Sequence, residues 1–113
     1  MKHINVEALP QVSQLKLDLI AAKALIDTPE KWCQGKFKKF NDDGSNRLCS
    51  GGAVYQSLGL GIENILRFKA VKAALEQAIG PEFTNVRYII GDYNDDHTHA
   101  EVMAMWDRAI ERA

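Results

Sequence analysis

Three stretches of this sequence carry apolar residues at steps of three and four positions, and this periodicity constrains the fold more than any other feature. Such spacing places apolar side chains on one face of an α-helix, and that face must be buried against another element. The stretches cover residues 12–26, 62–79 and 98–112. Gly80 and Pro81 end the second stretch, because glycine suits a helix cap and proline cannot continue a helix. The sequence therefore predicts three long helices that pack together.

The first stretch predicts a well-buried helix, because Leu17 and Ile20 broaden the apolar face over residues 12–26. Thr28 and Pro29 follow it and suit the start of a short helical turn. Thr28 would be the N-cap and Pro29 the first helical residue, a position where the missing N–H costs nothing.

A fourth, shorter helix is predicted over residues 48–58. The Asn, Asp and Gly residues at 41–46 predict a loop before it, whereas residues 36–40 fit a helical turn and an extended segment equally well. Gly51 and Gly52 lie in the first turn of this helix, where each disfavours the helix by about 1 kcal/mol relative to Ala. Close approach of another backbone or of a ligand is the usual compensation.

A polar run from Asp92 to Glu101 separates an apolar segment at residues 86–90 from the last helix. The apolar segment alternates like a short strand but fits extended coil equally well. Asn94, Asp95 and Asp96 are expected to form a turn, because Asn and Asp side chains accept hydrogen bonds from nearby backbone amides.

Thr98-His-Ala-Glu101 matches the capping box at the start of a helix. In this motif the threonine hydroxyl accepts from an amide one turn into the helix, and the glutamate side chain reaches back to the N-cap amide. The motif accounts for both residues without any ligand.

The chain has 113 residues, 46% of them apolar, which is enough for one hydrophobic core and too little for two. We predict a mainly α fold, a compact single-domain bundle of about four helices over residues 1–113, with at most one small β-hairpin. The core is expected to form around Trp32, Phe68, Leu75 and Trp106.

Lys and Arg together number 14 and Asp and Glu number 15, so the formal net charge is −1. A protein that neutralises phosphates normally carries a basic excess, so we expect no nucleic acid or anionic membrane as partner. Lys36, Lys38 and Lys39 form the only dense basic group in the sequence, and a solvated face is the simpler interpretation.

We expect a cytoplasmic protein. No apolar run approaches the roughly 20 residues of a membrane-spanning helix, and the first residues lack the apolar region of a secretory signal. Two cysteines, Cys33 and Cys49, are too few for a disulfide framework, which favours a reduced setting. A single Cys33–Cys49 bridge stays open as the alternative.

Two histidines in the polar run raise the hypothesis of a metal site. His97 and His99, with Asp95 or Asp96, offer nitrogen and oxygen ligands that divalent transition metals accept. Residues two apart in the first turn of a helix do not face each other, so at most one histidine joins such a site easily. The sequence contains no His-x-x-x-His or Cys-x-x-Cys spacing, and we predict neither a metal nor a cofactor.

Cys49 is the candidate for nucleophilic chemistry. A cysteine at a helix N-terminus can have a lowered pKa, because the exposed amides stabilise the thiolate. His97 or His99 would then act as the base of a cysteine-dependent hydrolase or transferase. Locally, Cys49-Ser-Gly resembles the nucleophile segment of the NlpC/P60 cysteine peptidases, although Leu48 stands where those enzymes usually carry an aspartate. A small buried side chain is the simpler interpretation.

The aromatic residues suggest a third hypothesis, a nucleotide pocket between the Gly51-Gly52 turn and the Asp92–Glu101 turn. Its candidate stacking residues are Trp32, Phe37, Phe40, Tyr55 and Trp106. Against it, the sequence contains no Walker loop, and aromatic residues in a domain of this size usually belong to the core.

Several short motifs follow one another along the chain. They are Trp32-x-x-Gly35, Asp43-Gly44, Cys49-x-x-Gly52-Ala53, Asn94-Asp95 and Thr98-x-x-Glu101-Val102, ending in Asp107-Arg108-Ala109-Ile110. This order is similar to that of a family of small uncharacterised proteins from bacteria and their phages. The resemblance covers most of the chain, and the aromatic residue that usually precedes Asn-Asp in the family is Tyr93 here.

These observations together predict a small non-catalytic interaction or accessory protein, carried by a bacterial or a phage genome, that binds an unidentified protein partner. The sequence holds no complete catalytic set, no metal-ligand spacing and no charge bias that would favour another class. The candidate binding residues are Trp32, Gly35, Gly51, Gly52, Asn94 and Asp95. The candidate catalytic residues of the enzyme hypothesis are Cys49, His97 and His99.

Overall fold

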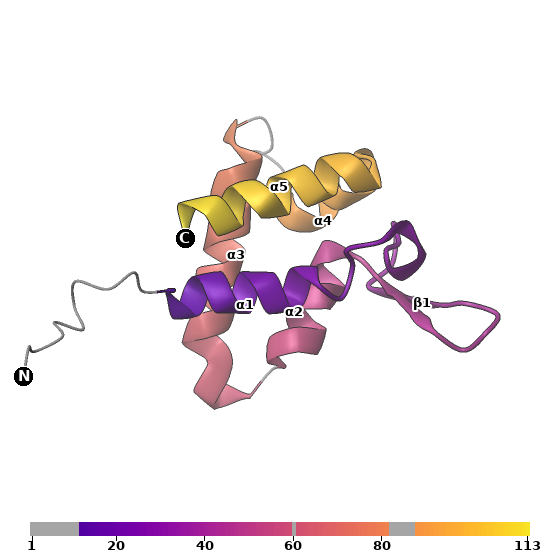
Figure 1. The fold of residues 1–113 in the computed structure, drawn as a ribbon, viewed down its shortest axis with the longest axis horizontal. Coiled ribbons are helices and arrows are strands. Elements are labelled where there is room, and N and C mark those ends of the chain that lie inside the picture. Colours follow the sequence, from indigo (N-terminus) through magenta and orange to yellow (C-terminus); the bar gives the residue numbers. More distant parts are fainter. Residues whose placement is uncertain (1–11, 60, 82–87) are drawn as a thin grey trace, which may run out of the picture.

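The computed structural model describes residues 12–59, 61–81 and 88–113, and Figure 1 shows their arrangement. Within these ranges the chain forms five α-helices, two short 3₁₀ turns and one two-stranded hairpin. The fold is therefore mainly α with one small hairpin, as the sequence predicted. None of the helices in these ranges is long and apolar enough to cross a membrane.

The elements follow one another in chain order. The α-helices are α1 (Gln14–Lys23), α2 (Ser50–Leu58), α3 (Ile65–Ile79), α4 (Ile89–Asp96) and α5 (His99–Arg112). The 3₁₀ turns are η2 (Pro29–Lys31) and η3 (Ile62–Asn64). Strands β1 (Lys38–Phe40) and β2 (Asn46–Leu48) pair in antiparallel register, with Lys38 opposite Leu48.

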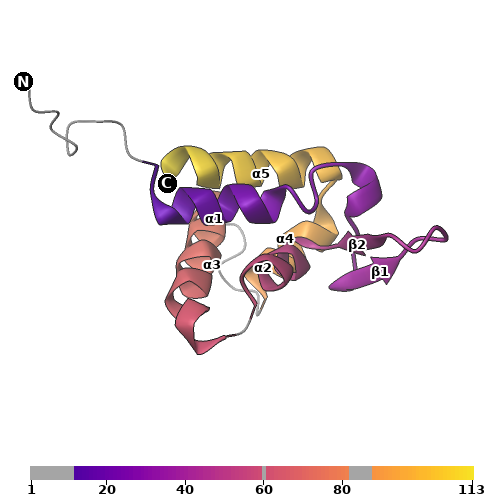
Figure 2. The same cartoon turned by 60° about the horizontal axis from the view of Figure 1, so that its bottom comes forward.

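Helices α1 and α5 lie side by side and run in opposite directions, and α3 crosses both of them (Figures 1 and 2). The hydroxyl of Ser13, the N-cap of α1, donates to the carbonyl oxygen of Ala113 at the end of α5 at 3.2 Å. Helix α2 packs against α1 and α3, and the hairpin projects from the N-terminal end of α2. This arrangement leaves one side of α3 facing α2 and α4.

The core lies where these helices meet, and Trp106 of α5 is its largest fully buried side chain. Leu19 of α1 and Leu75 of α3 are also fully buried. Trp106 and Leu75 confirm the predicted core. Trp32 and Phe68 lie at its edge, where they are partly buried.

Helix α1 is shorter and more exposed than predicted. It ends at Lys23 rather than near residue 26, and Leu17 and Ile20 are 49% and 46% exposed. The helix contacts its neighbours through one stripe, which includes Leu19 and Ala22, so the apolar residues outside that stripe face away from the core.

The segment between the first two helices settles one open alternative and corrects the predicted start of a helix. Residues 38–40 are extended rather than helical, and Leu48 belongs to β2 rather than to the following helix. Helix α2 therefore begins at Ser50, with Cys49 as its N-cap. Thr28 occupies the predicted N-cap position of η2, although its side chain makes no capping hydrogen bond.

The prediction was wrong for residues 89–96, which form helix α4. The sequence suggested a strand or coil up to residue 90, followed by a turn that includes Asn94, Asp95 and Asp96. Residues 86 and 87 of that segment lie outside the described ranges. Asn and Asp have low helix propensity, and long-range hydrogen bonds at the end of α4 offset that preference here.

The beginning of the last helix is as predicted. Thr98 is the N-cap of α5, its hydroxyl accepts from the Glu101 amide at 3.2 Å, and the Glu101 side chain accepts from the Thr98 amide at 2.9 Å. Gly80, at the end of α3, has φ 91°, which confirms the predicted glycine cap.

Candidate functional site

Asn94 is the centre of a buried hydrogen-bond network that joins three segments of the chain. Its side chain is 0% exposed. Its Oδ1 accepts from Trp32 Nε1 at 2.8 Å and from Ser50 N and Oγ at 3.0 and 2.9 Å. Its Nδ2 donates to the carbonyl oxygen of Cys33 at 3.0 Å. Ser50 Oγ accepts in turn from Trp106 Nε1 at 3.1 Å, so the network reaches the middle of the core.

Gln34 and Asp95 hold the same segments together nearer the surface. Gln34 Nε2 donates to the carbonyl oxygen of His97 at 2.8 Å and to two others at the end of α4, where helix carbonyls lack intrahelical partners. Asp95 Oδ1 accepts from the Gly35 amide at 2.8 Å. Gly35 has φ 79°, a conformation that favours glycine. These contacts join the Trp-x-x-Gly and Asn-Asp motifs in one cluster of hydrogen bonds.

Sequence reasoning missed Ser50 and Gln34, although both stand inside recognised motifs. Each occupies an unspecified position of its motif, and nothing in the neighbouring residues indicates a long-range hydrogen bond. Ser50 is a small polar residue directly after a helix N-cap. This position is the one local signal that fits a buried contact.

Cys49 caps α2 through its sulfur, which accepts from the Gly52 amide at 3.3 Å. Burial raises the pKa of the Cys49 thiol, and the hydrogen bond from Gly52 opposes this rise only in part. The shift is opposite in direction to the one expected for a nucleophile at a helix N-terminus. Cys49 is therefore held as a neutral thiol at neutral pH.

The two glycines at the start of α2 allow the segment around Phe37 to pass close by. A Cβ on Gly52 would overlap the carbonyl oxygen of Phe37, and a Cβ on Gly51 would lie 2.8 Å from the Phe37 ring. The predicted close approach is confirmed: backbone of the same chain approaches Gly52, and the Phe37 ring approaches Gly51.

Both histidines of the polar run contact backbone carbonyls. His97 Nδ1 lies 2.8 Å from the carbonyl oxygen of Tyr93, and the two rings stack with centroids 3.7 Å apart. His99 Nε2 lies 2.8 Å from the carbonyl oxygen of Ile26, and its ring meets Trp32 edge-on at 5.4 Å. A carbonyl oxygen only accepts, so these two ring nitrogens carry hydrogen. The imidazoles thus have structural contacts that the sequence did not indicate.

Neither imidazole is a hydrogen-bond partner of the Cys49 sulfur in the contacts of the described residues. In the same part of the chain, no group of three or more His, Cys, Asp or Glu side chains is placed to hold a metal ion.

A surface pocket of about 610 Å³ lies between α2, α3 and α4. A row of aromatic rings runs along it. Phe37 and Tyr55 meet edge-on with centroids 5.5 Å apart, and Tyr55 and Phe68 follow at 4.9 Å. Tyr88, just before α4, also lines it. We call this cavity the aromatic pocket.

Charged residues of both signs surround the aromatic pocket. Lys36 precedes β1 and Lys72 belongs to α3, whereas Asp92 and Asp95 belong to α4. Lys72 forms an ion pair with Glu76 at 3.0 Å. A second pocket adjoins it along α3 and shares Phe68, Lys72 and Glu76 with it.

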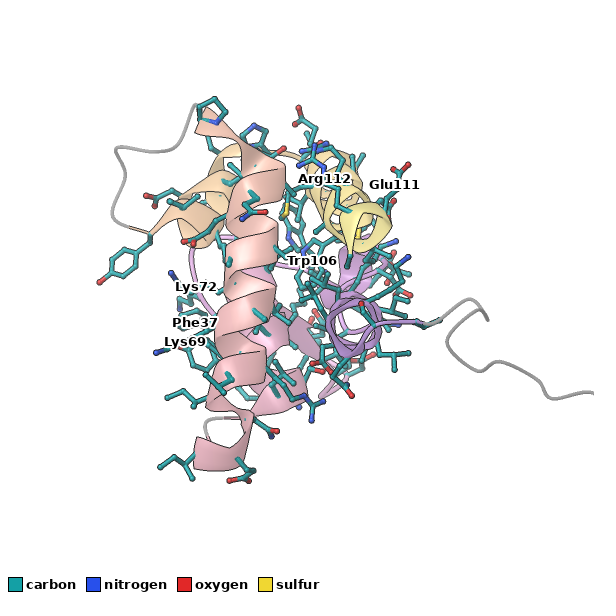
Figure 3. The ribbon with its side chains drawn as sticks, turned by 90° about the vertical axis from the view of Figure 1, so that its left-hand side faces the viewer. Phe37, Lys69, Lys72, Trp106, Glu111 and Arg112 are labelled. Carbon is teal, nitrogen blue, oxygen red and sulfur yellow. The ribbon has the colours of Figure 1, made fainter. Side chains whose placement is uncertain are left out.

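Figure 3 shows where the pockets lie relative to the core. Phe37, Lys69 and Lys72 gather on one side of α3, and Trp106 lies on the other side. Phe37 and Lys72, which line the aromatic pocket, thus lie on the side of α3 away from Trp106.

Only some of the predicted site residues line the aromatic pocket. Gly35, Cys49, Gly51 and Asp95 line the aromatic pocket. The other predicted site residues do not line it, and they are Trp32, Gly52, Asn94, His97 and His99. Of the aromatic residues proposed for stacking, Phe37 and Tyr55 line it, whereas Trp32, Phe40 and Trp106 do not. Phe68 and Tyr88 were not singled out as pocket residues, and no local pattern distinguishes them from core aromatics.

Comparison with known families identifies most of the chain. Residues 11–112 match the model of a family described as "Family of unknown function (DUF6197)", and the chain belongs to this family. No significant match was found among curated proteins or among solved structures.

Proposed function

We propose that this chain, as a member of a family of unknown function, is a non-catalytic module that binds a protein partner through the aromatic pocket. The observation that carries the proposal is the row of aromatic side chains along it. Phe37 and Tyr88, which both line it, are 62% and 64% exposed. Exposed aromatic residues gathered in a concave surface are typical of docking sites, because each ring buries a large apolar area with little loss of side-chain entropy.

The charges around the pocket support a peptide segment with an apolar anchor and flanking residues of both signs. Lys36 makes no ion pair with any described residue, and it would attract an acidic flank. Asp92 and Asp95 on α4 would attract a basic flank. The same two carboxylates would repel a phosphate chain, so the mixed charge favours a peptide over a nucleic acid.

The start of α2 supports a peptide over a nucleotide as well. A phosphate at a helix N-terminus needs free backbone amides. The amide of Cys49 donates to the Phe37 carbonyl at 3.2 Å, that of Ser50 to Asn94, and that of Gly52 to the Cys49 sulfur. These amides are already satisfied within the protein.

The enzyme hypothesis receives less support. A cysteine nucleophile needs a thiolate and an adjacent base. Burial raises the pKa of the Cys49 thiol, and His97 Nδ1 and His99 Nε2 lie 2.8 Å from the carbonyl oxygens of Tyr93 and Ile26.

We further propose that the chain acts in the cytoplasm of a bacterium or of a phage-infected cell. Its low cysteine content supports the compartment, because small secreted domains usually carry several disulfides. The order of its motifs, which resembles that of bacterial and phage proteins, supports the source.

A selection experiment tests the binding proposal. A yeast-displayed library of random peptides is selected on the immobilised protein and counter-selected on the Phe37→Ala/Tyr88→Ala double variant. The selected peptides should share an apolar anchor with acidic and basic flanks. Their Kd, measured by fluorescence anisotropy, should rise at least about tenfold for Phe37→Ala and for Tyr88→Ala, since hot-spot truncations cost 2 kcal/mol or more.

Phe40→Ala is the matched control, because Phe40 is 74% exposed but does not line the pocket. Its Kd should match that of the unmodified protein, and circular dichroism should show all variants folded. The proposal is wrong if no peptide survives counter-selection, or if the survivors bind the Phe37 and Tyr88 variants as tightly as the unmodified chain.

A further inference from the structure

The two cysteines belong to segments that lie side by side in parallel register. Trp32 and Leu48 form a parallel β-bridge, and the Cys33 amide donates to the Leu48 carbonyl at 3.0 Å. Cys33 and Cys49 are the next residues along the two segments, and Cys49 has the extended conformation of a strand, with φ −82° and ψ 177°. Paired strands lie about 4.8 Å apart, and residues directly opposite each other on the two strands point to the same face of the sheet. The side chains of Cys33 and Cys49 therefore start from adjacent backbone positions and point to the same face.

Both cysteines also contact residues 36 and 37, Cys33 through its sulfur and Cys49 through its backbone amide. Cys33 Sγ donates to the carbonyl oxygen of Lys36 at 3.4 Å. The amide of Cys49 donates to the carbonyl oxygen of the next residue, Phe37, at 3.2 Å. After burial, the nearby thiol of Cys33 is a further cause that raises the pKa of the Cys49 thiol, as expected for two adjacent sulfurs. Each side chain is 5% exposed.

We propose that Cys33 and Cys49 are a modification site, a dithiol that forms a reversible intramolecular disulfide with low-molecular-weight disulfides such as oxidised glutathione. The strand spacing of about 4.8 Å lies within the Cα–Cα range of roughly 4.4–6.8 Å that disulfides span. Rotation of the two side chains about their Cα–Cβ bonds replaces the contacts to Lys36 and Gly52 by the S–S bond. This site does not depend on the proposed binding function.

The exchange proceeds in two steps whose atoms and electrons balance. Cys49 lines the aromatic pocket and Cys33 does not, so the Cys49 thiolate attacks first. It forms a mixed disulfide with one half of the reagent and expels the other half as a thiolate. The Cys33 thiolate then attacks the Cys49 sulfur and expels the second half. The protein loses two electrons and two protons, and one disulfide reagent becomes two thiols.

The disulfide would close the loop from residue 33 to residue 49, which carries the β1–β2 hairpin seen in Figure 2. The same loop contributes Lys36 and Phe37 to the aromatic pocket. Oxidation would thus link the loop that carries Lys36 and Phe37 covalently to Cys49, the N-cap of α2.

The experiment exposes the folded, full-length chain to oxidised glutathione and follows its intact mass and its free thiols. The expected product has lost both thiols and two hydrogen atoms and carries no glutathione. Peptide mapping without reductant should recover the Cys33–Cys49 link, and dithiothreitol should restore both thiols. The rate should increase with pH, because only the thiolate reacts and the pKa values of both thiols are raised by burial.

Two controls make the result decisive. Cys33→Ser should stop at the mixed disulfide on Cys49, because the resolving thiol is absent. The unmodified chain unfolded in urea shows that the reagent is active. The inference is overturned if the folded chain keeps both thiols under conditions that oxidise the unfolded control, or if it accumulates a stable mixed disulfide on either cysteine.

Discussion

Replacing Asn94 by alanine should destabilise the fold more than most single substitutions, because one side chain satisfies polar groups from two distant segments. The substitution leaves the Ser50 amide and the Cys33 carbonyl without their partner inside the core. Trp32 is partly exposed, so water can replace the lost acceptor there. Ser50 Oγ keeps its hydrogen bond from Trp106.

The expected loss follows from the two backbone groups that remain buried. An unsatisfied buried group costs about 1–3 kcal/mol, so Asn94→Ala should lower the free energy of unfolding by about 2–6 kcal/mol. A domain of this size has roughly 5–15 kcal/mol in total, so the variant should be close to the limit of folding. With an m-value of roughly 2 kcal/mol per M, the urea midpoint should fall by about 1–3 M.

Urea unfolding followed by far-ultraviolet circular dichroism is the suitable assay, because both tryptophans contact the network and their fluorescence would change for local reasons. Asn46→Ala is the control, since Asn46 is exposed in β2 and its replacement should change stability by less than about 0.5 kcal/mol. A loss below about 1 kcal/mol for Asn94→Ala would refute the reasoning, because it would mean that water enters and replaces the amide.

Two further predictions concern a helix cap and an ion pair. Thr98→Ala removes the capping hydrogen bond of α5 and should lower the free energy of unfolding by about 0.5–2 kcal/mol. Thr28→Ala, at an N-cap whose side chain makes no such bond, should change it by less than about 0.5 kcal/mol in the same urea titration. Asp18 is buried and accepts two hydrogen bonds from Arg67, which hold the pKa of its carboxyl below the ordinary 3.8. The folded state therefore binds this proton more weakly than the unfolded state, so the stability it confers is present above pH 3.8 and is lost as the pH falls through the lower folded value. Asp18→Asn should flatten this acid decline in urea titrations between roughly pH 5 and pH 2, and an unchanged decline would contradict the assignment.

Local signals were sufficient to predict much of the fold. The capping box of Thr98 and Glu101 and the glycine cap at Gly80 involve groups within one helical turn, so a few neighbouring residues specify them. The long apolar periodicities predicted α1, α3 and α5 as helices, and the buried residues Leu75 and Trp106 followed from them.

The candidate site was predicted only in part. The sequence identified four motif residues that the structure brings together, namely Trp32, Gly35, Asn94 and Asp95. They meet mostly through hydrogen bonds to one another rather than around an open pocket. The pocket itself depends on how α2, α3 and α4 pack, and an exposed aromatic such as Tyr88 has the same sequence pattern as a buried one.

The sequence by itself determined where the long helices lie and how α5 begins, because periodicity and capping act over three or four residues. Only the tertiary structure decided that residues 89–96 are helical and that Asn94 is buried. The hydrogen bonds responsible join Asn94 to groups 44 to 62 residues away in the chain. The same holds for the approach of Phe37 to Gly52 and the pairing of the two cysteine-bearing segments, because contacts between distant segments leave no periodic trace in the sequence.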